Sequence, residues 1–146
     1  MEIKAVTLSD LEDIKKDYLE YFNQKENAEW TKDRVNRRFK QLVERYDYLG
    51  IGLYLEQDLV GFALGCYEQY DDILVTKLNE LFIVSKHQSK GYGTKLLKAY
   101  EARAKQGGAV RIQLESANDK AHHRFYNQMN EFLDASNNVL KAKSLN

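Results

Sequence analysis

The chain has 146 residues, of which 43% are hydrophobic and 30% charged, a composition that fits one globular domain. Lys and Arg number 22, as do Asp and Glu, so no net charge draws the chain to nucleic acid or to acidic membranes. Cys66 is the only cysteine, which excludes an intramolecular disulfide, and no run approaches the roughly 18 apolar residues of a membrane span. Without a signal-peptide pattern at the start, we expect one cytoplasmic domain over residues 1–146.

The first third of the chain predicts one strand and two helices. Residues 2–6 read as a short strand, and Ser9-Asp10-Leu11-Glu12 has the spacing of a helix capping box. Thr31 is the expected cap of the second helix. Apolar residues at helical spacing form the expected buried stripes of the two helices: Leu11, Ile14, Tyr18 and Phe22, then Val35, Phe39, Leu42, Val43 and Tyr46.

The middle of the chain predicts three strands, at residues 49–55, 59–68 and 74–84. The breaks between them are short enough for antiparallel hairpins. The third strand ends in a continuous apolar run at 81–84, which indicates burial on both faces.

The last third begins with a glycine-containing turn at 88–93 and a helix that ends at Gly107-Gly108. Residues 110–114 alternate as a strand, and Asn118 or Ser116 can cap a further helix. Residues 132–143 suggest a final hairpin. A strand–helix–strand unit after antiparallel hairpins predicts the α+β class, with a mixed, mostly antiparallel sheet flanked by helices.

The turn Gln88-Ser89-Lys90-Gly91-Tyr92-Gly93 has the features of an anion site. The first turn of a helix presents unpaired N–H groups and partial positive charge, and glycines at 91 and 93 permit positive φ and close approach of a phosphate. An ordinary strand-to-helix turn explains these letters equally well. A dinucleotide fingerprint fits worse because its third glycine is missing, and no Walker A string occurs.

Together with its surroundings, this turn resembles a known family. The run at 81–84 followed by Gln88-x-x-Gly91-x-Gly93 resembles the acetyl-CoA motif of the GNAT N-acetyltransferase superfamily. Asn118-x-x-Ala121-x-x-x-Phe125-Tyr126 is similar to the second motif of that family, and the order of elements matches its fold across the chain. The chain departs from the family at 85–87, where a proline is common, and at 130–132, where Gly-Phe is common.

The resemblance implies acetyl-CoA as co-substrate. Its pyrophosphate would bind the N–H groups of residues 88–94, and its pantetheine arm would lie along 82–84 like an added strand and contact Asn118. A backbone N–H near Val84 would polarise the thioester carbonyl. The implied cofactor-binding residues are Phe82, Ile83, Val84, Gln88, Ser89, Lys90, Gly91, Tyr92, Gly93, Thr94 and Asn118.

Two residues are candidates for the proton transfers of amide formation. By resemblance, Tyr126 matches the usual acid of the family and would protonate the departing thiolate, and a core aromatic beside Phe125 is the alternative. Glu80 is the candidate base because it shares an apolar strand with Phe82 and points to the same face as Val84. A solvated strand carboxylate is the equal alternative for Glu80.

Other polar patterns predict no further chemistry. His122 and His123 are adjacent, unlike the i, i+4 pair of a zinc site, so we expect no metal. Cys66 lies in an apolar strand and reads as a small core residue. The basic run at 34–45 reads as a solvated helix face rather than a nucleic-acid surface.

The sequence therefore predicts an enzyme that transfers an acetyl group from acetyl-CoA to a primary amine by direct attack. The amine, on a small molecule, a peptide or a protein, is not identified. The alternative is a non-catalytic acyl-CoA-binding or regulatory module of the same fold. We expect no nucleic-acid or membrane partner, and the apolar residues of the tail leave a homodimer open.

Overall fold

The computed structural model describes residues 1–146. Contacts separate the chain into two units, Met1–Leu114 and Glu115–Asn146. The expectation of a single domain over 1–146 stays a prediction.

The first unit contains, in chain order, β1 (Glu2–Ala5), the 3₁₀ turn η1 (Asp10–Ile14), α1 (Lys15–Lys25), α2 (Lys32–Val43), β2 (Tyr48–Leu55), β3 (Asp58–Gln69), β4 (Leu74–Ile83), the 3₁₀ turn η2 (Ser85–His87), α3 (Tyr92–Gln106) and β5 (Arg111–Gln113). The second unit contains α4 (Lys120–His123) and the π-helical turn η3 (Arg124–Met129).

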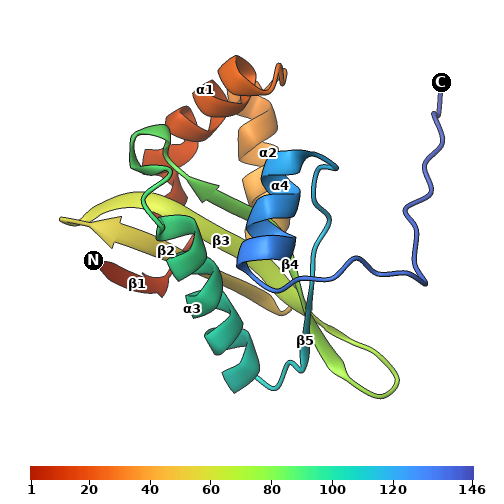
Figure 1. The fold of residues 1–146 in the computed structure, drawn as a ribbon. Coiled ribbons are helices and arrows are strands. Elements are labelled where there is room, and N and C mark those ends of the chain that lie inside the picture. The colour runs from red at the N-terminus through yellow and green to blue at the C-terminus, as the bar shows by residue number, and fades with distance from the viewer. The chain divides into compact units, whose positions relative to one another are not determined.

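The five strands form one sheet in the order β1-β2-β3-β4-β5 (Figure 1). The pairs from β1 to β4 are antiparallel, and β4 pairs with β5 in parallel, as expected when the helix α3 connects them. The α+β class with a mixed, mostly antiparallel sheet flanked by helices is thereby confirmed.

Helices cover both faces of the sheet, and Figure 1 shows α3 crossing one of them. On the other face, the rings of Tyr18, Phe39 and Phe62 lie 5.1 to 6.1 Å from one another, which joins α1 and α2 to β3. The predicted stripes are buried for the most part. Tyr46 is the exception: it lies beyond the end of α2 and is 84% exposed. None of the helices has the length and apolar composition that crossing a membrane requires.

In the first third of the chain, two helix starts were predicted from capping residues, and one of them is wrong. The Thr31 side chain accepts a hydrogen bond from the Arg34 N–H, as expected. Ser9 caps nothing, because its own backbone is already helical at φ −62° and ψ −41°. The reciprocal hydrogen bonds lie two residues earlier: the Asp10 carboxylate accepts from the Thr7 N–H, and the Asp10 N–H donates to the Thr7 hydroxyl.

An irregularity in the β3–β4 pairing decides which face of the sheet each β4 side chain occupies. Leu64 pairs with Glu80 whereas Gly65 pairs with Leu78, so Asn79 is an extra residue on β4. An even spacing normally places two strand residues on the same face, and the extra residue reverses this across the bulge. The Thr76 hydroxyl accordingly contacts α3, whereas the Glu80 carboxylate contacts α1 and α2.

The second unit departs furthest from the sequence predictions. The cap of α4 is Asp119, not Asn118 or Ser116, and its carboxylate accepts from the His122 N–H. Residues 131–146 contain no strand, so the predicted hairpin at 132–143 is wrong. A lone hairpin is marginal without a third strand or a helix to cover an apolar face. Four large apolar side chains of this tail are exposed: Leu133, Val139, Leu140 and Leu145.

Candidate active site

The second half of β4 has a strand partner on only one edge. β5 pairs with β4 from Val75 to Lys77 and no further, whereas β3 pairs with β4 up to Ile83. The backbone groups on the outer edge of β4 after Lys77 are therefore left without a ladder partner. Such an edge is where an extended ligand can add as a further strand.

This edge leads directly into the turn that the sequence singled out. Phe82, Ile83 and Val84 are buried, with exposed fractions of 3%, 8% and 5%. The Val84 N–H donates to the Val60 carbonyl, so in this structure it serves β3 rather than an oxyanion. After the short turn η2, Ser89 and Gly91 adopt positive φ angles of 61° and 86°, and α3 begins at Tyr92.

The N-terminus of α3 has the properties of an anion site. No side chain caps it, so the orphan N–H groups that every helix start presents are not occupied by a cap. A Cβ built on Gly91 would meet nothing within 4 Å, which shows open space in front of this turn. Ser89 and Lys90 are exposed, and Tyr92, Gly93 and Thr94 are half-buried in the first turn of the helix.

Two of the turn's predicted details differ in the structure. Gln88 makes two internal hydrogen bonds: its side-chain amide donates to the Ile83 carbonyl at 2.8 Å and its backbone N–H donates to the Ser85 carbonyl. Gln88 thus holds the strand end and the turn together. Gly93 lies inside α3 and has no positive φ, so the conformational need for glycine falls on Gly91 alone.

Glu80 lies on the face of β4 that α1 and α2 cover, in the half of the strand with the open edge. Its Oε1 accepts from the Tyr18 hydroxyl at 3.0 Å and from the Arg38 Nε at 2.9 Å. The Glu80 side chain is 15% exposed, which contradicts the alternative of a freely solvated carboxylate. Burial, followed by the neighbouring charge of Glu80, raises the pKa of Tyr18 well above its usual range and keeps its hydroxyl a donor.

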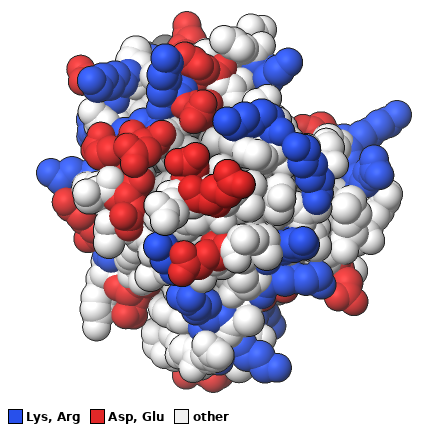
Figure 2. All heavy atoms as spheres, turned by 90° about the vertical axis from the view of Figure 1, so that its left-hand side faces the viewer, with Lys and Arg blue, Asp and Glu red and all other residues white.

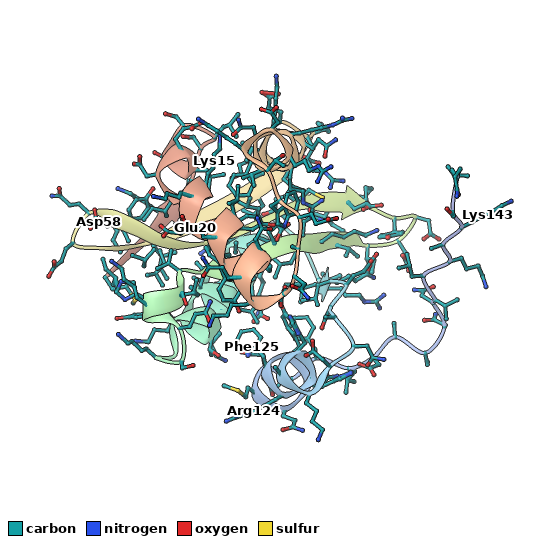
Figure 3. The ribbon with its side chains drawn as sticks, turned by 90° about the horizontal axis from the view of Figure 1, so that it is seen from above. Lys15, Glu20, Asp58, Arg124, Phe125 and Lys143 are labelled. Atoms are coloured by element: carbon teal, nitrogen blue, oxygen red, sulfur yellow. The ribbon has the colours of Figure 1, made fainter.

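A cavity of about 930 Å³ opens between η1, α1, the β2–β3 hairpin and η2. Val84 and Tyr92, which belong to the predicted cofactor segment, also line this cavity. Figure 2 looks onto this side of the molecule and shows acidic side chains gathered near its centre. Figure 3 labels Asp58 at the tip of the β2–β3 hairpin. The acidic residues that line the cavity are Asp10, Asp13, Asp17, Glu56 and Asp58. The name acidic cavity is used below for this space.

The second unit carries the remaining predicted residues. Tyr126 is half-buried, and its ring packs edge-on against Phe125 at 4.9 Å and Phe132 at 5.5 Å. One turn earlier, His122 stacks on it with centroids 6.5 Å apart. The Asn118 Oδ1 lies 2.6 Å from the His123 Nε2, so its oxygen is engaged within this unit. Their proposed acyl-transfer roles stay predictions.

Other candidate chemistry finds little support in the structure. No group of three or more His, Cys, Asp or Glu residues stands together in a way that could hold a metal ion. Cys66 is 1% exposed, as expected for a core residue, and burial raises the pKa of its thiol. A thiol in this state is a poor nucleophile, which argues against an acyl-enzyme on Cys66.

Sequence reasoning missed the partners of Glu80. Tyr18 was placed in the core by its helical spacing, and Arg38 was assigned to a solvated helix face. Neither assignment signals a contact across 62 and 42 residues of chain. The acidic cavity was also missed, because its carboxylates come from segments that are adjacent only in the folded sheet.

Comparison with known proteins gives a consistent result. The model of the acetyltransferase (GNAT) family matches residues 11–132. The spermine/spermidine N(1)-acetyltransferase of Bacillus subtilis strain 168 is 35% identical over an alignment of 112 positions that covers 70% of this chain and 74% of that protein. The crystal structure of a possible acetyltransferase from Clostridium difficile 630 matches with a TM-score of 0.82 and 14% identity, over 99% of this chain and 98% of the other. The crystal structure of a transcriptional regulator from Bacillus halodurans C-125 matches with a TM-score of 0.77 and 21% identity, over 98% of this chain and 99% of the other.

Proposed function

This chain belongs to the acetyltransferase (GNAT) family and is an acetyl-transferring enzyme, and on that premise we propose that it acetylates a primary amine of an aliphatic polyamine, with acetyl-CoA as the donor. Acetyl-CoA is the donor that this family generally uses. The observation that carries the donor assignment is the open outer edge of β4 leading into the uncapped N-terminus of α3. The edge offers backbone groups to an extended amide-containing chain, and the helix start offers N–H groups to a pyrophosphate.

The residues of these two segments fit such a donor. Phe82, Ile83 and Val84 give the strand end a buried apolar character, and Ser89 to Thr94 surround the helix start. Lys90 adds a positive charge beside it. When bound, acetyl-CoA supplies an activated acetyl thioester. Asn118 of the second unit stays proposed as a donor to the pantetheine.

The proposed chemistry requires three proton movements. Glu80 takes a proton from the bound ammonium group and passes it to water, so that a neutral amine attacks the thioester carbonyl. The C–N bond forms as the C–S bond breaks, the nitrogen loses its second proton to solvent, and the leaving thiolate takes a proton. Tyr126 is the proposed donor of that proton and regains one from solvent. The net change is one amide, one thiol and one proton released.

The acidic cavity supports a polyamine as the acceptor. Polyamines carry several ammonium groups along an apolar chain, and carboxylates at the wall of a cavity attract such a chain by charge. Five acidic residues and one lysine, Lys86, line the cavity, so carboxylates predominate, and Val84 and Tyr92 join it to the predicted donor site. The curated relative in Bacillus subtilis is a spermine/spermidine acetyltransferase. We propose that the cavity holds the ammonium groups that are not acetylated.

Thiol release from acetyl-CoA tests this function. The panel of acceptors is spermidine, spermine, putrescine, an aminoglycoside, free amino acids and a peptide with a free N-terminus. We expect spermine and spermidine to give the highest kcat/KM. Binding of acetyl-CoA without thiol release for any amine would favour the non-catalytic alternative. Turnover with peptides only would refute the polyamine assignment and leave the enzyme class intact.

A matched pair of variants tests the role of the acidic cavity. Asp17→Asn removes a carboxylate that lines the cavity, and Asp72→Asn removes an exposed one in the β3–β4 turn, outside the cavity. We expect Asp17→Asn to raise the KM for spermine roughly fivefold, the equivalent of about 1 kcal/mol for one partly exposed ion pair. The Asp72→Asn control should leave KM unchanged. Equal KM values in the two variants would remove the cavity from substrate binding.

A cytoplasmic location and a homodimer stay predictions. Analytical ultracentrifugation of the whole chain decides the second of these directly.

A further inference from the structure

A charged cluster of three side chains joins α1, α2 and β4 next to the packed aromatic rings of this face. Tyr18 contributes its hydroxyl, Arg38 its guanidinium and Glu80 its carboxylate. Tyr18 is only 2% exposed, and the side chains of Glu80 and Arg38 are 15% and 36% exposed. Burying a carboxylate to this extent is unfavourable unless charged or polar partners compensate. Tyr18 and Arg38 supply that compensation.

The two oxygens of the Glu80 carboxylate differ in their hydrogen bonds. Both hydrogen bonds, from the Tyr18 hydroxyl and the Arg38 Nε, end on Oε1. Within Met1–Leu114, no donor reaches Oε2. An ion pair that served stability alone would gain most by satisfying both oxygens, for example through a bidentate arginine. Here one oxygen is anchored and the other is left available.

The surroundings of the cluster suit a cationic, aliphatic ligand. Half-buried aromatic rings from α1 and the segment after it surround Tyr18 and the neighbouring Phe82 of β4. Phe22 lies 4.7 Å and Trp30 5.6 Å from the Tyr18 ring, and Tyr21 lies 5.7 Å from the Phe82 ring. A carboxylate held by one member of such an aromatic cluster combines a negative charge with apolar surface, the two properties that bind an ammonium group on a methylene chain.

The position of Glu80 along β4 places it near the proposed donor segment. Glu80 and Phe82 are two residues apart on one strand, which separates their Cα atoms by about 7 Å. The bulge at Asn79 turns Glu80 to the face of α1 and α2 rather than that of α3. A carboxylate at this distance can exchange a proton with an amine at the thioester directly or through one water.

We propose that Tyr18 and Arg38 are positioning residues for Glu80: they anchor Oε1 and thereby present Oε2 to the acceptor ammonium, whose proton Oε2 receives. This inference rests on the proposed function, because it concerns the base of that reaction. It assigns to two residues outside the predicted motifs a role in turnover. Neither needs to touch the substrate.

The inference is tested with Tyr18→Phe, Arg38→Gln and Arg38→Lys, assayed with spermidine, or with the best acceptor of the panel if spermidine is poor. Tyr18→Phe keeps the ring in the aromatic cluster and removes only the hydroxyl. We expect kcat to fall roughly tenfold in Tyr18→Phe and 10- to 100-fold in Arg38→Gln, since a displaced base costs about this much. Arg38→Lys, which restores the charge and one donor, should recover a large part of the loss.

Two control variants measure how much kcat changes when a similar side chain is altered away from Glu80. Tyr100→Phe also removes a fully buried hydroxyl, but from the α3 face, where it bonds to Thr76. Arg37→Gln removes the exposed arginine next to Arg38 on α2. Both should keep the wild-type kcat. In all variants, KM for the amine and the acetyl-CoA Kd measured by calorimetry should stay within about twofold, because positioning affects the chemical step.

A double-mutant cycle with Glu80→Gln distinguishes positioning from a general structural effect. If Tyr18 acts through the Glu80 carboxylate, Tyr18→Phe should change kcat less than about twofold in the Glu80→Gln background. A tenfold loss in both backgrounds would overturn the inference. So would wild-type kcat in Tyr18→Phe and Arg38→Gln when Glu80→Gln is impaired, a result that leaves the proposed function standing. Wild-type kcat in Glu80→Gln would overturn the role of Glu80 and this inference together, and absence of thiol release with every amine would overturn the proposed function as well.

Discussion

The two halves of β4 differ in how completely their buried polar side chains are hydrogen-bonded. In the half paired on both edges, the Thr76 hydroxyl donates to the Cys66 carbonyl and lies 2.6 Å from the Tyr100 hydroxyl. In the half with one open edge, Glu80 is anchored through one oxygen only. The first cluster is neutral and complete, and the second is charged and incomplete. The first cluster therefore stabilises the fold, whereas the second is the one to which we assign a part in the proposed reaction.

The largest effect should come from neutralising the incomplete cluster. Glu80→Gln keeps the shape and the acceptor oxygen of the side chain but removes its ability to take a proton. We expect kcat to fall roughly 100- to 1,000-fold, the usual contribution of a general base, with little loss of acetyl-CoA affinity. Steady-state thiol release and calorimetry measure the two quantities. A variant with unchanged kcat would show that both clusters of β4 are structural.

The complete cluster should respond in the opposite way. Thr76→Val removes one hydroxyl at nearly constant shape and leaves two buried partners, the Cys66 carbonyl and the Tyr100 hydroxyl, with one hydrogen bond fewer each. We expect the free energy of unfolding to fall by about 1 to 3 kcal/mol. The kcat of the folded enzyme should stay at the wild-type value. Urea denaturation measures the first, and a loss of kcat without a loss of stability would contradict the comparison.

The residues of the proposed donor segment can be grouped from the sequence, whereas those around Glu80 cannot, for a physical reason. The strand end, Gln88, Gly91 and the start of α3 follow one another along the chain, so local spacing is enough to place them. The cluster around Glu80 depends on contacts over 62 and 42 residues and on a bulge at Asn79. Asn79 is neither a glycine nor a proline, and nothing in the alternation of β4 marks it as an extra residue.

Predictions made from local patterns also fail where the pattern lacks tertiary support. Residues 132–143 alternate weakly and contain an Asn-rich turn, yet they form no strand. Helix starts show the same limit on a smaller scale. Ser9 and Thr7 both have an acidic residue three positions later, and only the backbone conformation, which the sequence does not state, selects Thr7 with Asp10.

A smaller effect, on acetyl-CoA affinity, should distinguish a substitution before α3 from one after it. Gly91 before the helix and Gly108 after it both have positive φ, at 86° and 101°. Alanine at either position costs about 1 to 2 kcal/mol of backbone strain. Only Gly91→Ala adds a methyl group in front of the helix N-terminus, so we expect its acetyl-CoA Kd to rise about fivefold. Gly108→Ala serves as the control with equal strain, and equal Kd values in the two variants would move the pyrophosphate away from this turn.

The smallest effect concerns a third polar cluster, that of Thr7 and Asp10 on the surface at the start of η1. Hydrogen bonds from the Thr7 N–H, and then from its hydroxyl, lower the pKa of Asp10 below its usual value. A carboxyl whose pKa is lowered by folding contributes stability that is present above its unfolded pKa and is lost as the pH falls through its folded pKa. Asp10→Asn keeps the acceptor oxygen but does not titrate.

The wild-type protein should therefore be more stable than the variant by a few tenths of a kcal/mol to about 1 kcal/mol at neutral pH, the scale of one exposed cap. This difference should be constant above about pH 5 and should shrink below pH ~4, where the wild-type carboxyl takes up its proton. Urea denaturation at a series of pH values measures it. A difference that does not change with pH would mean that the Asp10 hydrogen bonds, like those of Thr76, act without regard to charge.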